Sequence, residues 1–281
     1  MRVELCPNAL KDPGYSHTLR IVEILRNCGV SISMSEDIPL HVGIESTENA
    51  DPPDMLIVLG GDGSIMRSAR RGAAMGIPIL GIDLGRVGYL AELAPDDEEG
   101  LKDILAGNYY VENRMMLEAV AIKNGNEQGE GRVAINDVVL SHGNLSHLLE
   151  TEVFCDGSSI GRYRSDGFIV STPTGSTAYS LSAGGPVLAP GLKGICLTPI
   201  CPHSLTARPI IVPEDSDIEI KYLSPSGSKS HLTVDGVESA VLLPGDSLKI
   251  KRSALTADFI RANKDRVKNF YDVLREKMSD I

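Results

Sequence analysis

The sequence of 281 residues predicts two domains, an α/β domain with a parallel sheet followed by an all-β domain. Residues 55–59 form a continuous apolar run, Met-Leu-Ile-Val-Leu, which is typical of a strand buried on both faces of a parallel sheet. Strand and helix patterns alternate around this run, and such alternation is typical of α/β proteins. We expect strands at 2–5, 55–59 and 77–82, and helices at 16–28, 64–75 and 96–106.

The pattern changes after about residue 114, where short strands separated by Gly- or Asn-rich turns predict the all-β domain. From Asp258 the apolar residues recur at steps of three and four, which predicts a terminal helix. The expected domains are therefore 1–114, 115–257 and a helical segment, 258–281, that packs back on the first domain. The strands of the second domain are expected at 115–123, 132–140, 150–156, 165–171, 208–213, 217–222, 231–235 and 245–252.

The charge balance excludes several classes of partner. The chain has 27 Lys and Arg residues against 38 Asp and Glu residues, a net charge of −11, and an acidic surface repels nucleic acid and anionic lipid. Aromatic residues make up only 4% and Trp is absent, which argues against stacking platforms for bases. A phosphate-containing ligand must therefore be held by individual nearby groups and not by a positive surface. The 28 glycines make glycine-rich loops the first candidates.

The cysteines and the N-terminus predict a cytoplasmic, soluble protein with no membrane partner. The five cysteines are scattered and odd in number, so they do not form a disulfide framework. Cys196, Cys201 and His203 lie close together, but the sequence offers no second ligand pair, which favours buried thiols in a reducing compartment over a metal site. The sequence begins with no signal-peptide pattern, and no run approaches the ~20 apolar residues of a membrane span.

The first candidate site is the loop Gly60-Gly61-Asp62-Gly63-Ser64, between the buried strand and a helix. Ligands of open α/β sheets bind at this end of the strands. Glycines allow a backbone to approach a phosphate closely, and a helix N-terminus supplies free N–H groups. Asp62 can accept a proton from a hydroxyl nucleophile or help to hold Mg²⁺. The alternative interpretation is a tight turn in which Asp62 caps the helix.

Three arginines follow this loop on the predicted helix, Arg67, Arg70 and Arg71. Arg67 lies one turn into the helix, from which its side chain can reach an anionic ligand. The alternative for each of the three is a solvated surface position, which is the commoner position for arginine.

The second candidate site is the segment 165–186, in which a short strand runs into a cluster of hydroxyls and glycines. Hydroxyl groups bond ribose and phosphate oxygens without adding charge, whereas the alternative is a Ser/Thr-rich surface loop. The third candidate is the pair Asn136-Asp137, which interrupts the apolar run 133–140. An amide can read the edge of a base and a carboxylate can accept two ribose hydroxyls, whereas the alternative is a turn or bulge. The sequence has neither a P-loop nor a G-x-G-x-x-G motif.

These three elements together resemble the NAD kinase family in its bacterial form. The segments that carry the resemblance are 60–63, the pair Asn136-Asp137, the block 166–190 and a further segment, 81–90. The first loop is shared with 6-phosphofructokinases and with diacylglycerol and sphingosine kinases, so the resemblance implies their α/β fold for the first domain. The long Thr/Ser/Gly block is the specific part.

The resemblance implies ATP-dependent phosphorylation of the adenosine-ribose 2′-hydroxyl of NAD to give NADP, with Asp62 as the general base. It implies Mg²⁺ bound with ATP, with no metal site built from protein side chains alone, and a homo-oligomer (dimer or tetramer) in which neighbouring subunits contribute to the site. Gly60, Gly61, Gly63 and Ser64 are expected to form the phosphate loop for ATP. The residues expected to bind NAD are Asp62, Gly63, Arg67, Asn136, Asp137, His147, Arg164, Asp166, Thr174, Thr177, Ala178, Tyr179, Ser180, Leu181 and Ser182.

The sequence departs from the family pattern at three positions. Asp137 replaces the usual Glu, Asp83 stands where Asn is usual, and Val237 stands where a Gln commonly contacts the ligand. Two other hypotheses stay open: a kinase of the same superfamily that acts on a lipid or sugar, and a non-catalytic NAD(P)-binding regulatory protein. An assay for NADP formation separates the first hypothesis from both alternatives.

Overall fold

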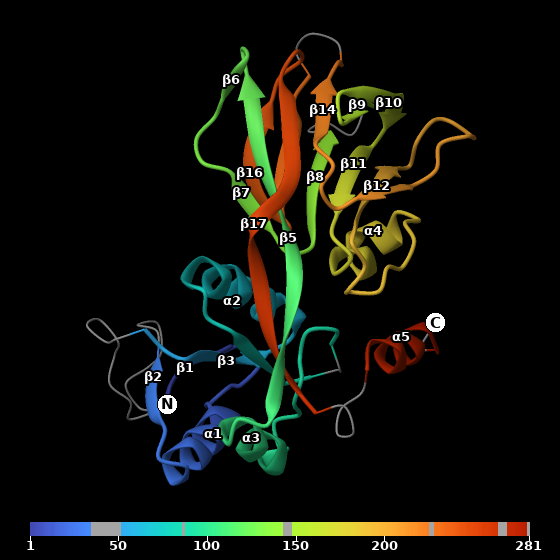
Figure 1. Ribbon diagram of the computed structural model, residues 1–281. Coiled ribbons are helices and arrows are strands. Elements are labelled where there is room, and N and C mark those ends of the chain that lie inside the picture. The colour runs from blue at the N-terminus through green and yellow to red at the C-terminus, as the bar shows by residue number, and fades with distance from the viewer. Residues whose placement is uncertain (35–51, 86–87, 143–147, 225–227, 264–268, 280–281) are drawn as a thin grey trace. The chain divides into compact units, whose positions relative to one another are not determined.

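The computed structural model describes residues 1–34, 52–85, 88–142, 148–224, 228–263 and 269–279 (Figure 1). The chain divides into two compact units. Unit 1 comprises Met1–Asn113 and Ala257–Ile281, and unit 2 comprises Arg114–Thr256. Two long strands, β5 (Tyr109–Lys123) and β17 (Ser247–Ala262), each contribute residues to both units.

Unit 1 is built on a parallel sheet. Its strands lie in the order β2-β1-β3-β4, and the end of β17 continues the sheet beside β4 through Phe259 and Ile79. All six residues of β3 are buried, as the continuous apolar run predicted. The first four strands are β1 (Arg2–Pro7), β2 (Ser31–Met34), β3 (Met55–Gly60) and β4 (Ile79–Asp83).

Helices cover this sheet. α1 (Ser16–Asn27) and α3 (Glu98–Leu105) share one apolar cluster with the strands, and α2 (Asp62–Met75) packs against β3 and β4 on the other face (Figure 1). α5 (Phe270–Ser279) also belongs to unit 1, where the Phe270 ring lies 5.7 Å from the Tyr89 ring. Among the described residues, no helix has the length and apolar character that crossing a membrane requires. The predicted α/β class of the first domain and its terminal helix are confirmed.

Unit 2 is a two-sheet antiparallel structure, which confirms the predicted all-β class. One sheet has the order β13-β12-β11-β8-β15-β16, and in the other β9 pairs with β10 and β14. Apolar side chains of both sheets form one cluster, with Val138, Phe168, Val153 and Ile220 among them. The remaining elements are β6 (Asn126–Glu127), β7 (Arg132–Ala134), β8 (Asp137–His142), β9 (Leu149–Cys155), β10 (Ser158–Ser165), β11 (Gly167–Ser171), η2 (Gly175–Thr177), α4 (Tyr179–Ser182), β12 (Gly194–Ile200), β13 (Ile210–Pro213), β14 (Ile218–Tyr222), β15 (Ser230–Val234) and β16 (Val237–Leu242).

The structure corrects the predicted helical segment 258–281. Residues up to Ala262 continue β17, and α5 begins only at Phe270. The predicted strand 132–140 is divided into β7 and β8, because Ile135 and Asn136 do not continue the ladder. Strands β2, β6, β10, β12 and β16 were not predicted.

Candidate active site

The glycine-rich loop joins β3 to α2 in unit 1, and residues that follow β1 hold it. Asn8 donates from Nδ2 to the Ser64 hydroxyl at 2.7 Å, and the Asn8 N–H bonds the Leu59 carbonyl oxygen at 2.9 Å. Gly61 is the N-cap of α2 in an extended conformation and makes no side-chain cap. The N-terminal end of α2 therefore lies at this loop, where the helix dipole favours negative charge.

Asp62 is the first residue of α2, and its carboxylate is held by a neighbouring loop. Oδ2 accepts the Tyr89 N–H at 2.9 Å, and Oδ1 accepts the Leu90 N–H at 3.1 Å. A Cβ atom added at Gly88 would collide with this carboxylate, so the loop approaches Asp62 as closely as glycine permits. The alternative in which Asp62 caps the helix is wrong, because Gly61 is the N-cap and the Asp62 carboxylate is bonded to the 88–90 backbone.

Arg67 and Gly63 differ in their contacts with the rest of the protein. Arg67 is exposed and donates to the Ser64 hydroxyl at 3.3 Å, so its side chain lies along the N-terminal turn of α2. Apart from its own helix backbone and chain neighbours, no atom of the described residues lies within 4 Å of the place where a Cβ at Gly63 would sit. Packing therefore does not explain this glycine, and the open space beside it is compatible with a ligand.

Lys11 is a cation at this loop that the sequence analysis did not identify. A Cβ at Gly61 would run into the Lys11 ammonium, which places this charge over the loop. Lys11 follows β1 at the carboxyl end of the parallel sheet, where ligands of open α/β sheets bind. Its position shortly after a predicted strand was the feature of the sequence that could have identified Lys11.

Asp83 provides a second carboxylate close to Asp62. It ends β4 beside Gly60, and its Oδ1 accepts the Gly85 N–H at 3.0 Å. Its Oδ2 is buried and accepts no hydrogen bond of standard geometry from the part of the chain that the structure describes. Burial raises the pKa of the Asp83 carboxyl, and the charge of Asp62 raises it further.

These two carboxylates are the candidate ligands for the metal that the resemblance implies. Within the described ranges, no group of three His, Cys, Asp or Glu side chains is arranged to hold a metal ion. Mg²⁺ typically takes one or two carboxylates and completes its shell with water and substrate phosphates. The orphaned Asp83 Oδ2 and the Asp62 carboxylate fit that mode, because a nucleotide would supply the remaining oxygens.

In unit 2, Asp235 fixes the backbone that carries the Asn136-Asp137 pair. Its Oδ1 accepts the N–H groups of Asn136 at 2.8 Å and Asp137 at 3.2 Å, and its Oδ2 accepts that of Ile135 at 3.0 Å. Asp235 has a positive φ of 49° in the turn between β15 and β16. Asp235 was not among the predicted site residues, although its position in Val-Asp-Gly was a turn signal.

The Asp137 carboxyl is buried at the start of β8. It is only 6% exposed, and burial followed by the charge of Asp235 raises its pKa to about 7. The 172–176 turn lies directly on this segment, since the Thr172 hydroxyl bonds the Ile135 carbonyl oxygen at 2.5 Å and a Cβ at Gly175 would collide with the Asn136 backbone. Two of the three predicted site segments therefore meet in unit 2.

Some hydroxyls of the 171–182 segment bond other groups of the protein, whereas the side chains of Tyr179 and Ser182 are exposed. Ser176 bonds Pro173 and Leu188 backbone groups, and Ser180 lies 3.0 Å from the Thr198 hydroxyl, so these two are used inside the protein. Thr177 donates to the Thr174 carbonyl oxygen at 3.2 Å. The short helix α4 carries Tyr179, Leu181 and Ser182 on the surface, and Ala178 precedes it as a half-buried residue.

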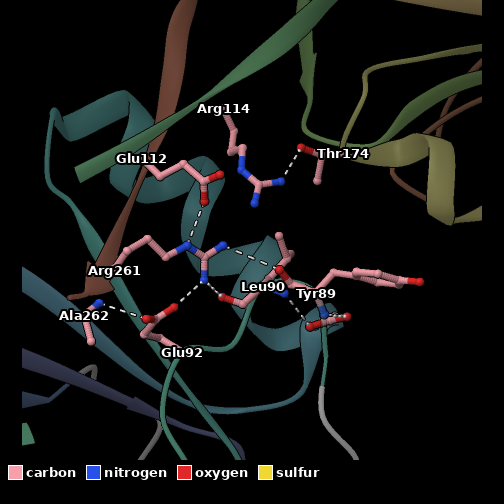
Figure 2. Close-up of polar contacts among 9 residues, drawn as sticks. Tyr89, Leu90, Glu92, Glu112, Arg114, Thr174, Arg261 and Ala262 are labelled. Atoms are coloured by element: carbon pink, nitrogen blue, oxygen red, sulfur yellow. Dashed lines mark hydrogen bonds and ion pairs between the residues drawn. The ribbon is translucent and has the colours of Figure 1, made fainter. Parts of the chain in front are cut away.

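Thr174 has a charged neighbour that the sequence analysis also missed. Arg114 is 3% exposed and donates from Nη1 to the Thr174 hydroxyl at 3.1 Å (Figure 2). A buried arginine beside a predicted ligand-binding hydroxyl is an uncommon arrangement, because charges are costly to bury. The sequence signal was weak, since Arg114 lies at the expected domain boundary.

Arg164 and Asp166 lie apart from the Asn136-Asp137 group. Both precede β11, whereas Thr174 follows it, and the five residues of β11 span about 17 Å at ~3.3 Å per residue. Arg164 is exposed and pairs with Glu150 at 3.0 Å, and Asp166 lies 3.8 Å from the His142 ring. His147 lies outside the described residues.

A glycine-rich loop with a fixed carboxylate at a helix N-terminus, and a second unit that carries an amide, a carboxylate and hydroxyls, are typical of a phosphotransferase. Residues 42–109 match the ATP-NAD kinase N-terminal domain, and residues 135–262 match the ATP-NAD kinase C-terminal domain. The chain belongs to the NAD kinase family.

Two sequence relatives and two solved structures that resemble this chain are NAD or NADH kinases. The NAD kinase of Desulforamulus reducens is 41% identical over 239 residues, which covers 85% of this chain and 81% of the relative. The NAD kinase of Acetivibrio thermocellus is 36% identical and covers 100% of this chain and 98% of the relative. Yeast NADH kinase complexed with NADH superposes with a TM-score of 0.80 at 27% identity, covering 99% of this chain and 87% of the yeast chain. An NAD kinase from Archaeoglobus fulgidus in complex with ATP gives a TM-score of 0.75 at 27% identity, covering 98% of this chain and 99% of that one.

Proposed function

We propose that this enzyme transfers the γ-phosphoryl group of ATP to the adenosine-ribose 2′-hydroxyl of NAD, giving NADP, with Asp62 as general base. The observation that carries the proposal is the Asp62 carboxylate, fixed by two backbone N–H groups at the N-terminus of a helix that follows a buried parallel strand. A ribose hydroxyl is a poor nucleophile at neutral pH. A positioned carboxylate removes its proton as the new O–P bond forms.

Unit 1 supplies the groups that a triphosphate needs. The backbone of Gly60, Gly61, Gly63 and Ser64 lies at the positive end of the α2 dipole, and Lys11 and Arg67 add two cations to an otherwise acidic protein. Phosphoryl transfer depends mainly on positioning and charge neutralisation, which these groups provide. When bound with ATP, Mg²⁺ would offset the triphosphate charge, with the Asp83 carboxylate as its candidate protein ligand, which leaves Asp62 as the base. The Archaeoglobus relative in complex with ATP supports this donor.

Unit 2 supplies the groups that recognise NAD. The Asn136 amide is proposed to read the adenine edge, and the Asp137 carboxylate to accept ribose hydroxyls. Thr174 and the surface of η2 and α4 are proposed to surround the adenosine end through Thr177, Ala178, Tyr179, Ser180, Leu181 and Ser182. Because the Ser180 hydroxyl bonds Thr198, its proposed contact with NAD is through its backbone. Asp62, Gly63 and Arg67 complete the proposed contacts from unit 1.

Arg164 and Asp166 are proposed to bind the nicotinamide half, together with His147. Their place at the far end of β11 from Thr174 supports a homo-oligomer, dimer or tetramer, in which one subunit's Arg164 contributes to a neighbour's site. Sedimentation of the enzyme, followed by mixing of Arg164→Ala and Asp62→Asn subunits, tests this arrangement. Recovered activity in the mixed sample supports sharing between subunits, and no recovery contradicts it.

A coupled assay tests the reaction. The protein is incubated with ATP, Mg²⁺ and NAD, and NADP is detected with an NADP-specific dehydrogenase. Asp62→Asn is expected to lose about 10³-fold in turnover, because the base is removed. Its amide N–H then faces one of the two backbone N–H groups that the carboxylate accepts, so its folding is checked by circular dichroism and thermal denaturation. Unchanged turnover in this variant excludes Asp62 as the base.

The same assay separates the two alternative functions. Absence of NADP with the unaltered enzyme favours a kinase of another acceptor or a binding protein. Calorimetric binding of NAD without turnover then selects the non-catalytic NAD(P)-binding protein.

A further inference from the structure

Arg261 is the centre of a buried ionic cluster in unit 1. It lies near the end of β17, is 8% exposed, and bonds Glu92 Oε2 through Nη1 at 2.8 Å and Glu112 Oε2 through Nε at 2.7 Å (Figure 2). The second oxygen of Glu92 accepts the Ala262 N–H at 2.8 Å. Taking an arginine out of water is costly, and this cluster offsets the cost with two carboxylates.

The same guanidinium also holds the loop that positions Asp62. Its Nη1 donates to the Leu90 carbonyl oxygen at 3.2 Å, and its Nη2 donates to the Tyr89 carbonyl oxygen at 3.5 Å (Figure 2). The N–H groups of these two residues are the ones that bond the Asp62 carboxylate. Arg261 and Asp62 therefore bond the backbone of the same two residues, Tyr89 and Leu90.

One peptide group connects the two side chains directly. The peptide between Tyr89 and Leu90 receives the Arg261 guanidinium at its carbonyl oxygen and presents its N–H to Asp62 Oδ1. In a trans peptide the C=O and N–H point in opposite directions. The cation thus lies at the negative end of the peptide dipole and the carboxylate at its positive end, so both charges fix the orientation of this peptide.

We propose that Arg261 is a positioning residue for catalysis, which fixes the orientation of the Asp62 carboxylate through the Tyr89–Leu90 peptide. The proposal rests on the proposed role of Asp62. Only arginine suits this position, because its planar fork of five N–H donors serves two carboxylates and two carbonyl oxygens at once. A lysine keeps the charge but has three donors on one nitrogen, so it cannot serve both the glutamates and the loop.

Arg261→Lys is the first test. We expect kcat for NADP formation to fall about 30-fold, since misplacement of a reacting group by ~1 Å costs up to ~10²-fold. The KM values for ATP and NAD should change by less than about threefold, because Asp62 is the one proposed nucleotide contact that the variant displaces. Arg71→Lys is the matched control: Arg71 pairs with the buried Glu4 in the same unit without contacting the 88–90 loop, and its kcat should stay within about twofold.

A second variant covers the possibility that Arg261→Lys does not fold. Arg261→Gln combined with Glu92→Gln removes one positive and one negative charge, so the net charge of the cluster is kept. The Glu112 carboxylate keeps its charge and loses its arginine partner, but its side chain is 30% exposed to solvent. Its folding is checked by circular dichroism and thermal denaturation, and it should show a kcat loss at least as large as that of Arg261→Lys. A folded variant with undiminished kcat overturns the proposal.

Hydrogen exchange and a combined variant separate positioning from general stability. In Arg261→Lys the peptide covering residues 88–92 should exchange faster, while the peptide covering β3 should be unchanged. Placed on Asp62→Asn, Arg261→Lys should cause no further loss of the residual rate, because the carboxylate that it orients is already absent. A full additional loss in that background contradicts the proposal. Failure of the unaltered enzyme to form NADP contradicts the proposed function instead, so the two failures are distinguishable.

Discussion

The two units each contain one carboxylate at the centre of a predicted site, and the two are held in opposite ways. Asp62 of unit 1 receives two backbone N–H groups from the 88–90 loop. Asp137 of unit 2 is buried beside another carboxylate, Asp235, which takes the nearby backbone N–H groups for itself. Burial and the charge of Asp235 raise the pKa of Asp137 to about 7.

This difference suits two different tasks. A base for phosphoryl transfer needs a fixed position next to the reacting hydroxyl, and the loop provides it through its backbone. A carboxylate that binds ribose hydroxyls needs oxygens that can accept hydrogen bonds from the nucleotide, and the ribose hydroxyls supply the donors. Two aspartates in one protein thus acquire different chemistry from their surroundings.

After the loss of Asp62 itself, the largest expected effect comes from forcing the loop away from its carboxylate. Gly88→Ala places a methyl group against the Asp62 carboxylate, so we expect kcat to fall about 10²-fold with little change in the melting temperature. Gly191→Ala is the matched control, because a Cβ there meets no atom within 4 Å and φ needs no glycine. Stopped or continuous assays of NADP formation measure both variants. Equal activity of the two would show that the loop does not position the base.

A smaller effect is expected from loosening the segment that carries Asp137. In Asp235→Asn, the new amide N–H faces one of the backbone N–H groups that donate to the carboxylate. The free energy of unfolding should therefore fall by about 1–3 kcal/mol. The melting temperature should fall by several degrees and the KM for NAD should rise by about tenfold.

Asp246→Asn is the control for this prediction. Asp246 is a buried aspartate of the same unit whose Oδ2 accepts the Leu243 N–H at 2.9 Å, away from Asn136. It should lose similar stability with an unchanged KM for NAD. A rise in KM for both variants would mean that NAD binding follows unit 2 stability in general.

These comparisons depend on contacts that the sequence revealed only in part. The loop 60–64 was predicted because its glycines, its helix and its preceding buried strand are all local signals. The positions of Asp62 relative to Gly88 and of Asp137 relative to Asp235 were not predicted, because they join residues 26 and 98 positions apart. Without an aligned family pattern for those pairs, no local periodicity shows that they meet.

The helices and strands could likewise be predicted only in part from the sequence. The helix predicted from Asp258 fails because residues 258–262 take their strand conformation from distant partners, such as Ile79 beside Phe259. The spacing of Phe270, Tyr271 and Leu274 is helical in the structure as predicted. β10 was missed because its exposed, polar residues lack a buried apolar stripe. Arg261 was missed because a single arginine at the end of a strand has no signature until its partners are known.

The smallest expected effect is a pH dependence confined to unit 2. The Asp137 carboxyl has a pKa of about 7 in the folded protein and an ordinary value of 3.8, so the folded state keeps its proton while the unfolded state loses it. Stability from this group is therefore present below about pH 4 and is lost as the pH rises to about 7. Thermal denaturation should show Asp137→Asn gaining stability relative to the unaltered protein between pH 5 and pH 8, by about 2 °C or more.

NAD affinity should move in the opposite direction. The carboxylate form accepts the ribose hydroxyls, so the Kd for NAD should fall up to about tenfold from pH 6 to pH 8 in the unaltered protein. Asp137→Asn should bind NAD with a Kd that does not depend on pH in this range. Calorimetric titrations at both pH values measure it, and an identical pH dependence in the variant would assign the effect to another group.

The central claim is that Asp62 performs the chemistry and Asp137 binds the nucleotide. The most direct test measures kcat and the Kd for NAD together in Asp62→Asn and Asp137→Asn at pH 8. We predict that Asp62→Asn binds NAD within about threefold of the unaltered enzyme but turns over about 10³-fold more slowly, whereas Asp137→Asn binds NAD more weakly and keeps kcat at saturation within about threefold. The reverse pattern, with turnover preserved in Asp62→Asn or lost in Asp137→Asn at saturating NAD, would contradict this division of roles.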